Sequence, residues 1–171
     1  MHFMCHCEDC EVLFNGAFRG FAYTEIDLEL KGPHDTYSYE GGSGSLLHLT
    51  FCKNCGMNLF SKPDLLEGLV YVFAGLMKEH YTFEPKVEIF AHNRLPWVTR
   101  ADSVVQTYDH NGTIERVSEL LENIDQRGYR KRKSSDIYVY HMKCLFPHGE
   151  AVELMIYERW RGMIVVVEHA I

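Results

Sequence analysis

Five of the six cysteines in this 171-residue chain form two tight clusters. Cys5, Cys7 and Cys10 make a Cys-x-Cys-x-x-Cys motif, and Cys52 and Cys55 make a Cys-x-x-Cys pair. Thiolates this close repel one another unless a cation neutralises them, and Zn²⁺ does so with Zn–S bonds of about 2.3 Å. A secreted disulfide framework rarely places three cysteines so near to one another. The spacing therefore predicts zinc binding, with a redox Cys-x-x-Cys as the alternative.

The residues around the second pair support the same chemistry. Gly56 follows the pair directly, and a glycine there leaves the backbone N–H groups able to point at the sulfur atoms. The sixth cysteine, Cys144, stands alone in an alternating apolar segment, so we expect a small buried hydrophobic residue there. His6 lies between two candidate ligands, where we expect an exposed loop histidine. The alternative for His6 is a proton carrier beside the metal.

The elements that must position these cysteines are mainly strands. Several segments alternate apolar and polar residues, which is the pattern of half-buried β-strands. Turns rich in glycine and proline separate them, and the Cys-x-x-Cys pair falls on a turn directly after one strand. We expect these strands at residues 17–23, 26–30, 37–39, 46–51, 57–60, 69–74 and 87–90.

The chain changes character near residue 111. Residues 1–111 hold 8 of the 17 Lys and Arg and 15 of the 24 Asp and Glu, so the net charge of −7 falls entirely in this part. Residues 112–171 are neutral, and apolar residues at helical spacing between 114 and 124 predict a helix. Strands are expected at 137–146, 151–160 and 163–170. The sequence predicts a domain over 1–111 and a helix-plus-β-meander addition over 112–171.

Composition excludes several classes of protein. With 46% hydrophobic and 24% charged residues, the chain is neither disordered, collagen-like nor a coiled coil. No apolar run reaches the roughly 18–20 residues of a membrane span, so we expect no membrane partner. The net charge of −7 argues against nucleic acid, and the basic run 127–133 is expected to be a solvated linker. Cys5 leaves no room for a signal peptide, and six cysteines without one predict the reducing cytoplasm.

Taken in order, the motifs resemble those of a known family. The similarity extends over roughly residues 3–108, and the motifs are specific in combination although each is common alone. The family is the glutathione-dependent formaldehyde-activating (GFA) family, which also includes centromere protein V. The residues that carry the resemblance are Cys5-His6-Cys7-x-x-Cys10, Phe51-Cys52-x-x-Cys55-Gly56-x-x-Leu59-Phe60, Ala74-Gly75-Leu76, Pro85, Ile89-Phe90 and Pro96-Trp97.

The resemblance implies a β domain of two sheets that carries zinc. By position, Cys5, Cys7 and Cys10 would hold an open zinc that meets a thiol substrate. Cys52 and Cys55 would form half of a second, structural zinc site, which an upstream Cys-x-Cys completes in the family. The implied activity is of carbon–sulfur lyase or synthase type: glutathione adds to formaldehyde and gives S-(hydroxymethyl)glutathione.

Three departures from the family pattern bear on that activity. We expect the chain to lack the upstream Cys-x-Cys strand, which would leave Cys52 and Cys55 without two partners. Glu11 stands where the family often has an arginine, which removes a contact for anionic glutathione. Glu88 stands where the family usually has a histidine.

Two alternatives follow from the residues themselves. Cys5 and Cys7 with Cys52 and Cys55 would make one closed tetrahedral Cys₄ zinc site, with Cys10 left out. In that case the protein is a non-catalytic, zinc-stabilised module that binds another protein. The addition over 112–171 either covers an exposed sheet edge or mediates assembly into a homo-oligomer.

Overall fold

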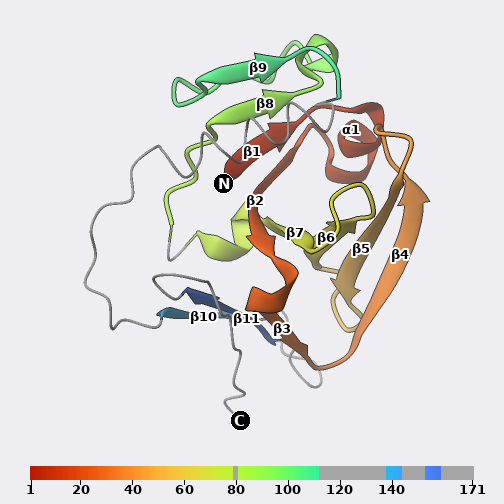
Figure 1. Cartoon of the computed structure of the whole chain (residues 1–171), viewed down its shortest axis with the longest axis vertical. Helices are drawn as coiled ribbons and strands as arrows, with labels where there is room; N and C mark the ends of the chain where they lie inside the picture. The colour runs from red at the N-terminus through yellow and green to blue at the C-terminus, as the bar shows by residue number, and fades with distance from the viewer. Residues whose placement is uncertain (79–80, 112–137, 144–152, 159–171) are drawn as a thin grey trace. The chain divides into compact units, whose positions relative to one another are not determined.

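The structure is a computed structural model that describes residues 1–78, 81–111, 138–143 and 153–158, and the chain forms two compact units (Figure 1). One unit consists of Met1–Gly20 and Phe83–Lys133, and the other of Phe21–Thr82 and Ser134–Ile171. Strand β2 (Phe18–Thr24) leads from the first unit into the second. Most of the described elements are strands, so the predicted mainly β class is confirmed.

The first unit is built on three parallel strands, β1 (His2–Cys5), β8 (Val87–Ile89) and β9 (Gln106–Tyr108). β8 pairs with β1 on one side and with β9 on the other. The ladder continues past the end of β1, because the N–H of His6 donates to the carbonyl of Ile89 at 3.0 Å. A short 3₁₀ turn, η3 (Ala91–Asn93), follows β8. The first cysteine motif therefore starts where a paired strand ends.

Side-chain alternation gives these strands two distinct faces. Phe3 and Cys5 point to one face of β1, and Met4 points to the other. In the parallel register Glu88 of β8 lies beside Met4 and so shares its face. His6 continues the alternation of β1, which places it on the side of Met4 and Glu88.

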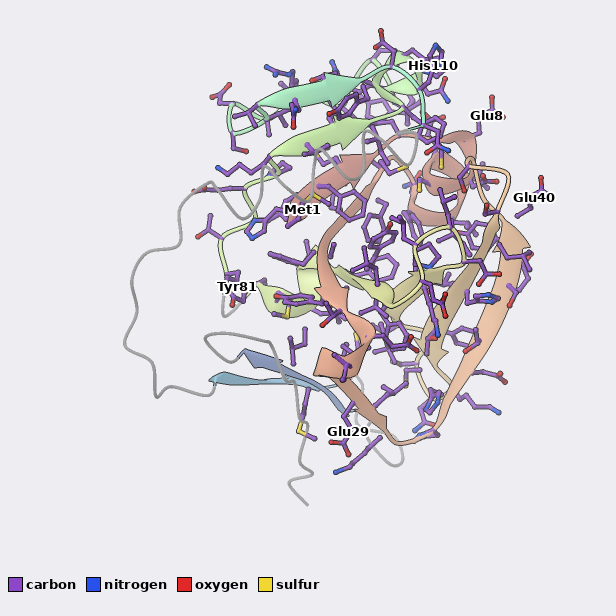
Figure 2. All side chains as sticks on the ribbon, in the orientation of Figure 1. Met1, Glu8, Glu29, Glu40, Tyr81 and His110 are labelled. Atoms are coloured by element: carbon purple, nitrogen blue, oxygen red, sulfur yellow. The ribbon has the colours of Figure 1, made fainter. Side chains whose placement is uncertain are left out.

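A short helix, α1 (Glu8–Phe14), follows β1 directly and holds the third cysteine of the motif. Glu8, Asp9 and Glu11 fill its first turn, where acidic side chains interact favourably with the helix dipole. The helix ends at Asn15, which adopts the left-handed conformation with φ 52°, and Gly16 follows it. Glu8, labelled in Figure 2, points outward from this helix. Helix α1 was not predicted from the sequence, because the alternation of strand residues does not reveal it. The signals for this helix are the acidic first turn and the Asn-Gly pair at its end.

The second unit contains an antiparallel run of four strands in the order β4-β5-β6-β7. Every other residue of β6 and β7 is buried, as alternation predicts, and Leu59, Val70 and Val72 are almost fully covered. Two 3₁₀ turns, η1 (Glu25–Asp27) and η2 (Ala74–Met77), belong to the same unit. The strands are β4 (His34–Glu40), β5 (Leu46–Cys52), β6 (Asn58–Pro63) and β7 (Leu69–Phe73).

A second sheet of this unit joins strands that lie more than 100 residues apart in the sequence. β10 (Tyr138–Lys143) and β11 (Glu153–Glu158) pair antiparallel, and β11 pairs with β3 (Leu28–Lys31). Leu154, Met155 and Ile156 of β11 are fully buried. The predicted strands at 137–146 and 151–160 are confirmed in these parts, and the second strand shares a sheet with residues near the start of the unit.

The remaining sequence predictions divide into three groups. Strands expected at 17–23, 37–39, 46–51, 57–60, 69–74 and 87–90 correspond to β2, β4, β5, β6, β7 and β8. The strand expected at 26–30 is shorter than predicted, because η1 occupies residues 25–27 and β3 starts at Leu28. The expected helix after 112, the strand at 163–170 and Cys144 lie outside the described residues, so the boundary near residue 111 stays a prediction. Within the described part, no helix is long and apolar enough to cross a membrane.

Candidate metal centre

Three cysteine sulfur atoms converge where β1 passes into α1. Cys5 ends the strand, Cys7 is the residue that caps the helix, and Cys10 lies in the first helical turn. Their Sγ atoms all lie within 4.8 Å of one another. The turn is held by the N–H of Glu11, which donates to the carbonyl of Cys7 at 3.0 Å. The short motif therefore brings three soft donors together through one strand end and one helical turn.

This cluster is buried, which strongly affects its protonation. Cys5, Cys7 and Cys10 are 8%, 4% and 5% exposed. The pKa of Cys10 is raised by its hydrogen bonds with Cys5 and Cys7, and then by burial. For Cys5, the hydrogen bond with Cys10 lowers the pKa, but the bond with Cys7 and burial outweigh it and raise the pKa overall. The protein alone thus disfavours three thiolates here, and a bound cation would reverse that preference.

The geometry fits one zinc ion. A tetrahedral zinc with Zn–S bonds of about 2.3 Å holds its sulfur ligands about 3.8 Å apart. The sulfur atoms need to approach by only about 1 Å to reach that spacing, given their 4.8 Å limit. Among the residues that the structure describes, no histidine, aspartate or glutamate joins this group. Cys5, Cys7 and Cys10 are therefore positioned to bind a metal through three thiolates.

The second cysteine pair lies in the other unit, on the turn between β5 and β6. The N–H of Gly56 donates to the carbonyl of Cys52 at 2.8 Å, and φ of Gly56 is 71°, a conformation that favours glycine. The predicted turn after a strand is thus confirmed. Cys52 is a fully buried free thiol. The metal role of Cys52 and Cys55 stays a prediction.

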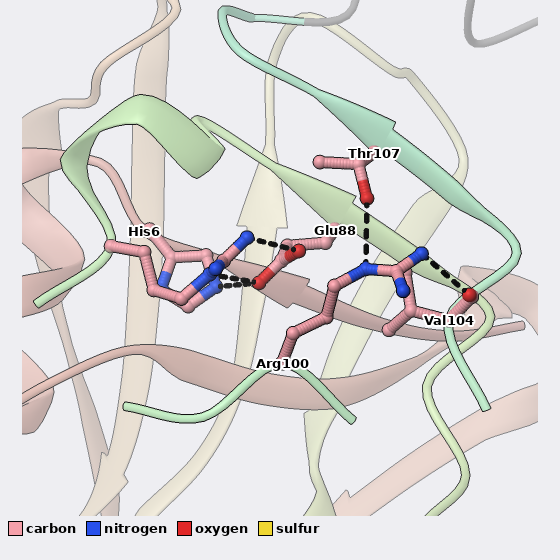
Figure 3. Close-up of polar contacts among 6 residues, drawn as sticks. His6, Glu88, Arg100, Val104 and Thr107 are labelled. Carbon is pink, nitrogen blue, oxygen red and sulfur yellow. Dashed lines mark hydrogen bonds and ion pairs between the residues drawn. The ribbon is translucent and has the colours of Figure 1, made fainter. Parts of the chain in front are cut away.

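His6 is buried, and the expectation of an exposed loop histidine is wrong. Its side chain has no exposed surface, and its Nε2 lies 2.8 Å from Oε1 of Glu88, which is equally buried (Figure 3). The cause is alternation along β1, which turns His6 toward the face of Glu88 and away from solvent. Nδ1 of His6 is also buried, and no polar group of the described residues reaches it.

Arg94 completes this network from the segment after β8. Its Nε donates to Oε1 of Glu88 at 2.8 Å and its Nη2 donates to Oε2 at 2.9 Å, a two-point contact that holds both carboxylate oxygens. Burial lowers the pKa of His6, and Glu88 opposes that shift only in part. The imidazole is therefore neutral near pH 7 and donates Nε2–H to the carboxylate, which can only accept.

A further arginine of this unit was not found from the sequence. Arg100 donates to Thr107 and to the carbonyl of Val104 (Figure 3). The signal for the whole network is Glu88 itself, since a charged residue within the apolar strand Val87–Ile89 needs a buried partner. The partner that the sequence does not identify is Arg94, which follows from the fold of the segment after β8.

A cavity of about 350 Å³ opens in the same unit. This volume is within the range of small-molecule sites. Arg19 is its one charged lining residue, and the described residues give that guanidinium no hydrogen bond or ion pair. Trp97 lies at the cavity and is 75% exposed. Other lining residues are Met4, Phe83, Pro85 and Thr99.

A mainly β chain with a buried cluster of three cysteines positioned to bind a metal defines a class of β protein with a candidate metal centre. Within that class, the family model described as glutathione-dependent formaldehyde-activating enzyme matches residues 1–93, just over half of the 171 residues. The chain belongs to this family. The matched range contains both cysteine clusters and Glu88. No curated protein matches the chain.

Proposed function

We propose that this chain binds one zinc through Cys5, Cys7 and Cys10 and acts on a thiol–aldehyde adduct, as a carbon–sulfur lyase or synthase. The observation that carries this proposal is the buried group of three Sγ atoms within 4.8 Å, with no fourth ligand among the described residues. Family membership supports the choice of glutathione and formaldehyde as first substrates. The reaction joins the thiol sulfur to the aldehyde carbon and moves the thiol proton to the aldehyde oxygen.

When bound, zinc would supply an open coordination position for a thiol sulfur and would lower the pKa of that thiol. The three cysteines would hold the ion and would exclude water from its protein side, because they are buried. Their three negative charges exceed the charge of the ion by one. This excess negative charge would make the ion a weaker activator of the aldehyde. The site therefore suits binding and carrying the thiol at least as well as activating the aldehyde.

Arg19 gives the proposal a contact for an anionic thiol. Glu11 removes the arginine that the family pattern places after the cysteine motif, but the cavity beside Met4 offers the guanidinium of Arg19. Met4 directly precedes the ligand Cys5 in β1, with its side chain on the opposite face of the strand. A carboxylate of glutathione would pair with Arg19, and the exposed ring of Trp97 would cover its apolar part.

The test is the rate of adduct formation by zinc-loaded protein. Exchange between formaldehyde and S-(hydroxymethyl)glutathione is followed by NMR at equilibrium, with cysteine and 2-mercaptoethanol as further thiols. We expect exchange above the uncatalysed rate for the wild type and none above it for Cys10→Ala. A wild-type rate equal to the uncatalysed rate for every thiol would remove the enzymatic proposal. Arg19→Gln should raise the glutathione concentration needed, with little effect on 2-mercaptoethanol, which has no carboxylate.

A second candidate function is a zinc-stabilised module without catalysis. The burial of His6 favours it, because a histidine held by Glu88 with no exposed surface is not a mobile proton carrier. In this case zinc contributes folding energy, and chelation should unfold the first unit. The closed Cys₄ arrangement stays an alternative. The location of the protein in the cytoplasm likewise stays a prediction.

A further inference from the structure

We propose that Glu88 and His6 form a positioning pair that fixes the loop between two zinc ligands. This inference rests on the proposed zinc site, but it concerns metal affinity and not the reaction. His6 is the residue between Cys5 and Cys7, so any movement of its backbone moves both sulfur atoms. The side chain of His6 is tied to β8, and through it to Arg94.

The first part of the evidence is the double attachment of His6. Its backbone N–H donates to the carbonyl of Ile89 at 3.0 Å, and its Nε2–H donates to Oε1 of Glu88 at 2.8 Å. Both partners belong to the same strand, β8. The residue between the ligands is therefore held at its main chain and at its side chain by one rigid element.

The second part is that Glu88 cannot easily move. Arg94 holds both carboxylate oxygens, at 2.8 and 2.9 Å, and the carboxylate is completely buried. A buried carboxylate that lost these partners would be strongly destabilising, so Glu88 keeps one orientation. That orientation fixes the plane and the tautomer of the His6 ring.

The third part is the face on which the pair lies. Alternation along β1 turns Cys5 and Cys7 to one side of the extended chain and His6 to the other. Within the described residues His6 also stays outside the group of metal-ligating atoms. His6 therefore acts on the metal only through the backbone of its neighbours. Groups that orient metal ligands without binding the metal typically alter its affinity by about 10- to 100-fold.

The experiment measures zinc affinity by competition with a chromophoric chelator at fixed pH, on the full chain. Glu88→Leu keeps the approximate volume and removes the acceptor, whereas Glu88→Gln keeps an oxygen that accepts from His6. We expect zinc affinity to fall by about 10- to 100-fold for Glu88→Leu and by no more than about threefold for Glu88→Gln. His6→Phe removes the donor and leaves the pair of Glu88 and Arg94 intact, and it should match Glu88→Leu.

The matched control is Thr50→Val. It also removes a hydrogen bond of a buried side chain, between the hydroxyls of Thr50 and the exposed Thr36, but it lies in the other unit. Its zinc affinity should equal that of the wild type. An equal loss in this control would mean that general destabilisation explains the result, and the inference would fail. Circular dichroism of each metal-free variant shows whether it is folded, and His6→Phe replaces Glu88→Leu if the latter is not.

Cobalt binding separates positioning from direct ligation. The thiolate-to-cobalt charge-transfer absorption should keep its wild-type intensity at saturation in Glu88→Leu and His6→Phe, since the three sulfur ligands remain. If only His6→Phe weakens binding and its cobalt spectrum changes, His6 is a ligand and the inference is wrong. Zinc affinities within twofold of the wild type in both variants would also overturn it. A wild type that binds no zinc would overturn the proposed function and this inference together.

Discussion

Replacement of Cys10 by alanine gives the most direct test of the metal centre. In the open three-thiolate arrangement Cys10 supplies one of three sulfur ligands, within 4.8 Å of the other two. In the closed Cys₄ alternative, built from Cys5, Cys7, Cys52 and Cys55, it supplies none. The substitution removes a single sulfur atom from a site that is already 95% covered, so the metal-free fold should change little.

The expected loss of affinity follows from the strength of zinc–thiolate bonding. Structural zinc sites bind with about 10–16 kcal/mol at neutral pH, so each of three or four ligands accounts for about 3–5 kcal/mol. Removal of one thiolate should therefore weaken zinc binding by about a hundred- to a few thousandfold. The alanine costs the metal-free protein only about 1 kcal/mol of stability. The two effects are separable because one is measured with zinc and the other without it.

Native mass spectrometry gives the zinc count of each protein, and chelator competition gives its affinity. We expect one zinc in the wild type and none in Cys10→Ala under the same conditions. Cys52→Ala, which removes a buried thiol of the other unit, should keep its zinc. One zinc retained by Cys10→Ala and lost by Cys52→Ala would refute the three-thiolate centre and establish the closed site.

Three further predictions concern stability. Burial lowers the pKa of His2 from its ordinary 6.5 to about 4 in the folded protein. As the pH drops from about 6.5 toward 4, His2 is protonated in the unfolded chain before it is protonated in the folded one, so the stability of the fold should decrease. Because His2 is partly exposed, urea unfolding should show a loss of only about 1 kcal/mol, which His2→Gln abolishes. Leu154→Ala should lower the free energy of urea unfolding by about 2–5 kcal/mol, since this side chain is fully buried in β11. Ile26→Ala, at an exposed position, is the control and should change it by no more than about 0.5 kcal/mol. An equal effect of both substitutions would contradict the pairing of β11. Removal of zinc by a chelator should lower the melting temperature, because zinc binds only the folded protein. If free zinc stands at 100 times its dissociation constant, the stability lost on removal is about 2.7 kcal/mol. An unchanged melting temperature would mean that no zinc is bound.

Much of the β framework could be predicted because its signals are local. Alternation along β6 and β7 follows from the two faces of a strand, one buried and one partly exposed. The turn at Gly56 likewise follows from the conformational freedom of glycine next to a cysteine pair. The convergence of Cys5, Cys7 and Cys10 was predictable because six residues of chain cannot separate them far.

The polar network around Glu88 could not be predicted, since it depends on contacts between distant parts of the sequence. His6 and Glu88 are 82 residues apart and meet only because β1 and β8 pair in parallel. No local pattern specifies that pairing or its register.

The pairing of β11 with β3 affects how this protein can be shortened. The family match ends at residue 93, which suggests that a chain of about that length would be the natural fragment to express. Such a fragment would lose β9, the partner of β8 in the unit that holds the cysteine cluster. It would also lose β11, leaving the hydrogen-bonding groups of β3 open to a strand from another molecule. Fragments that end at residue 93 should therefore aggregate. A shortened protein that keeps both sheets needs β9 and β11 as well as the residues of the family match.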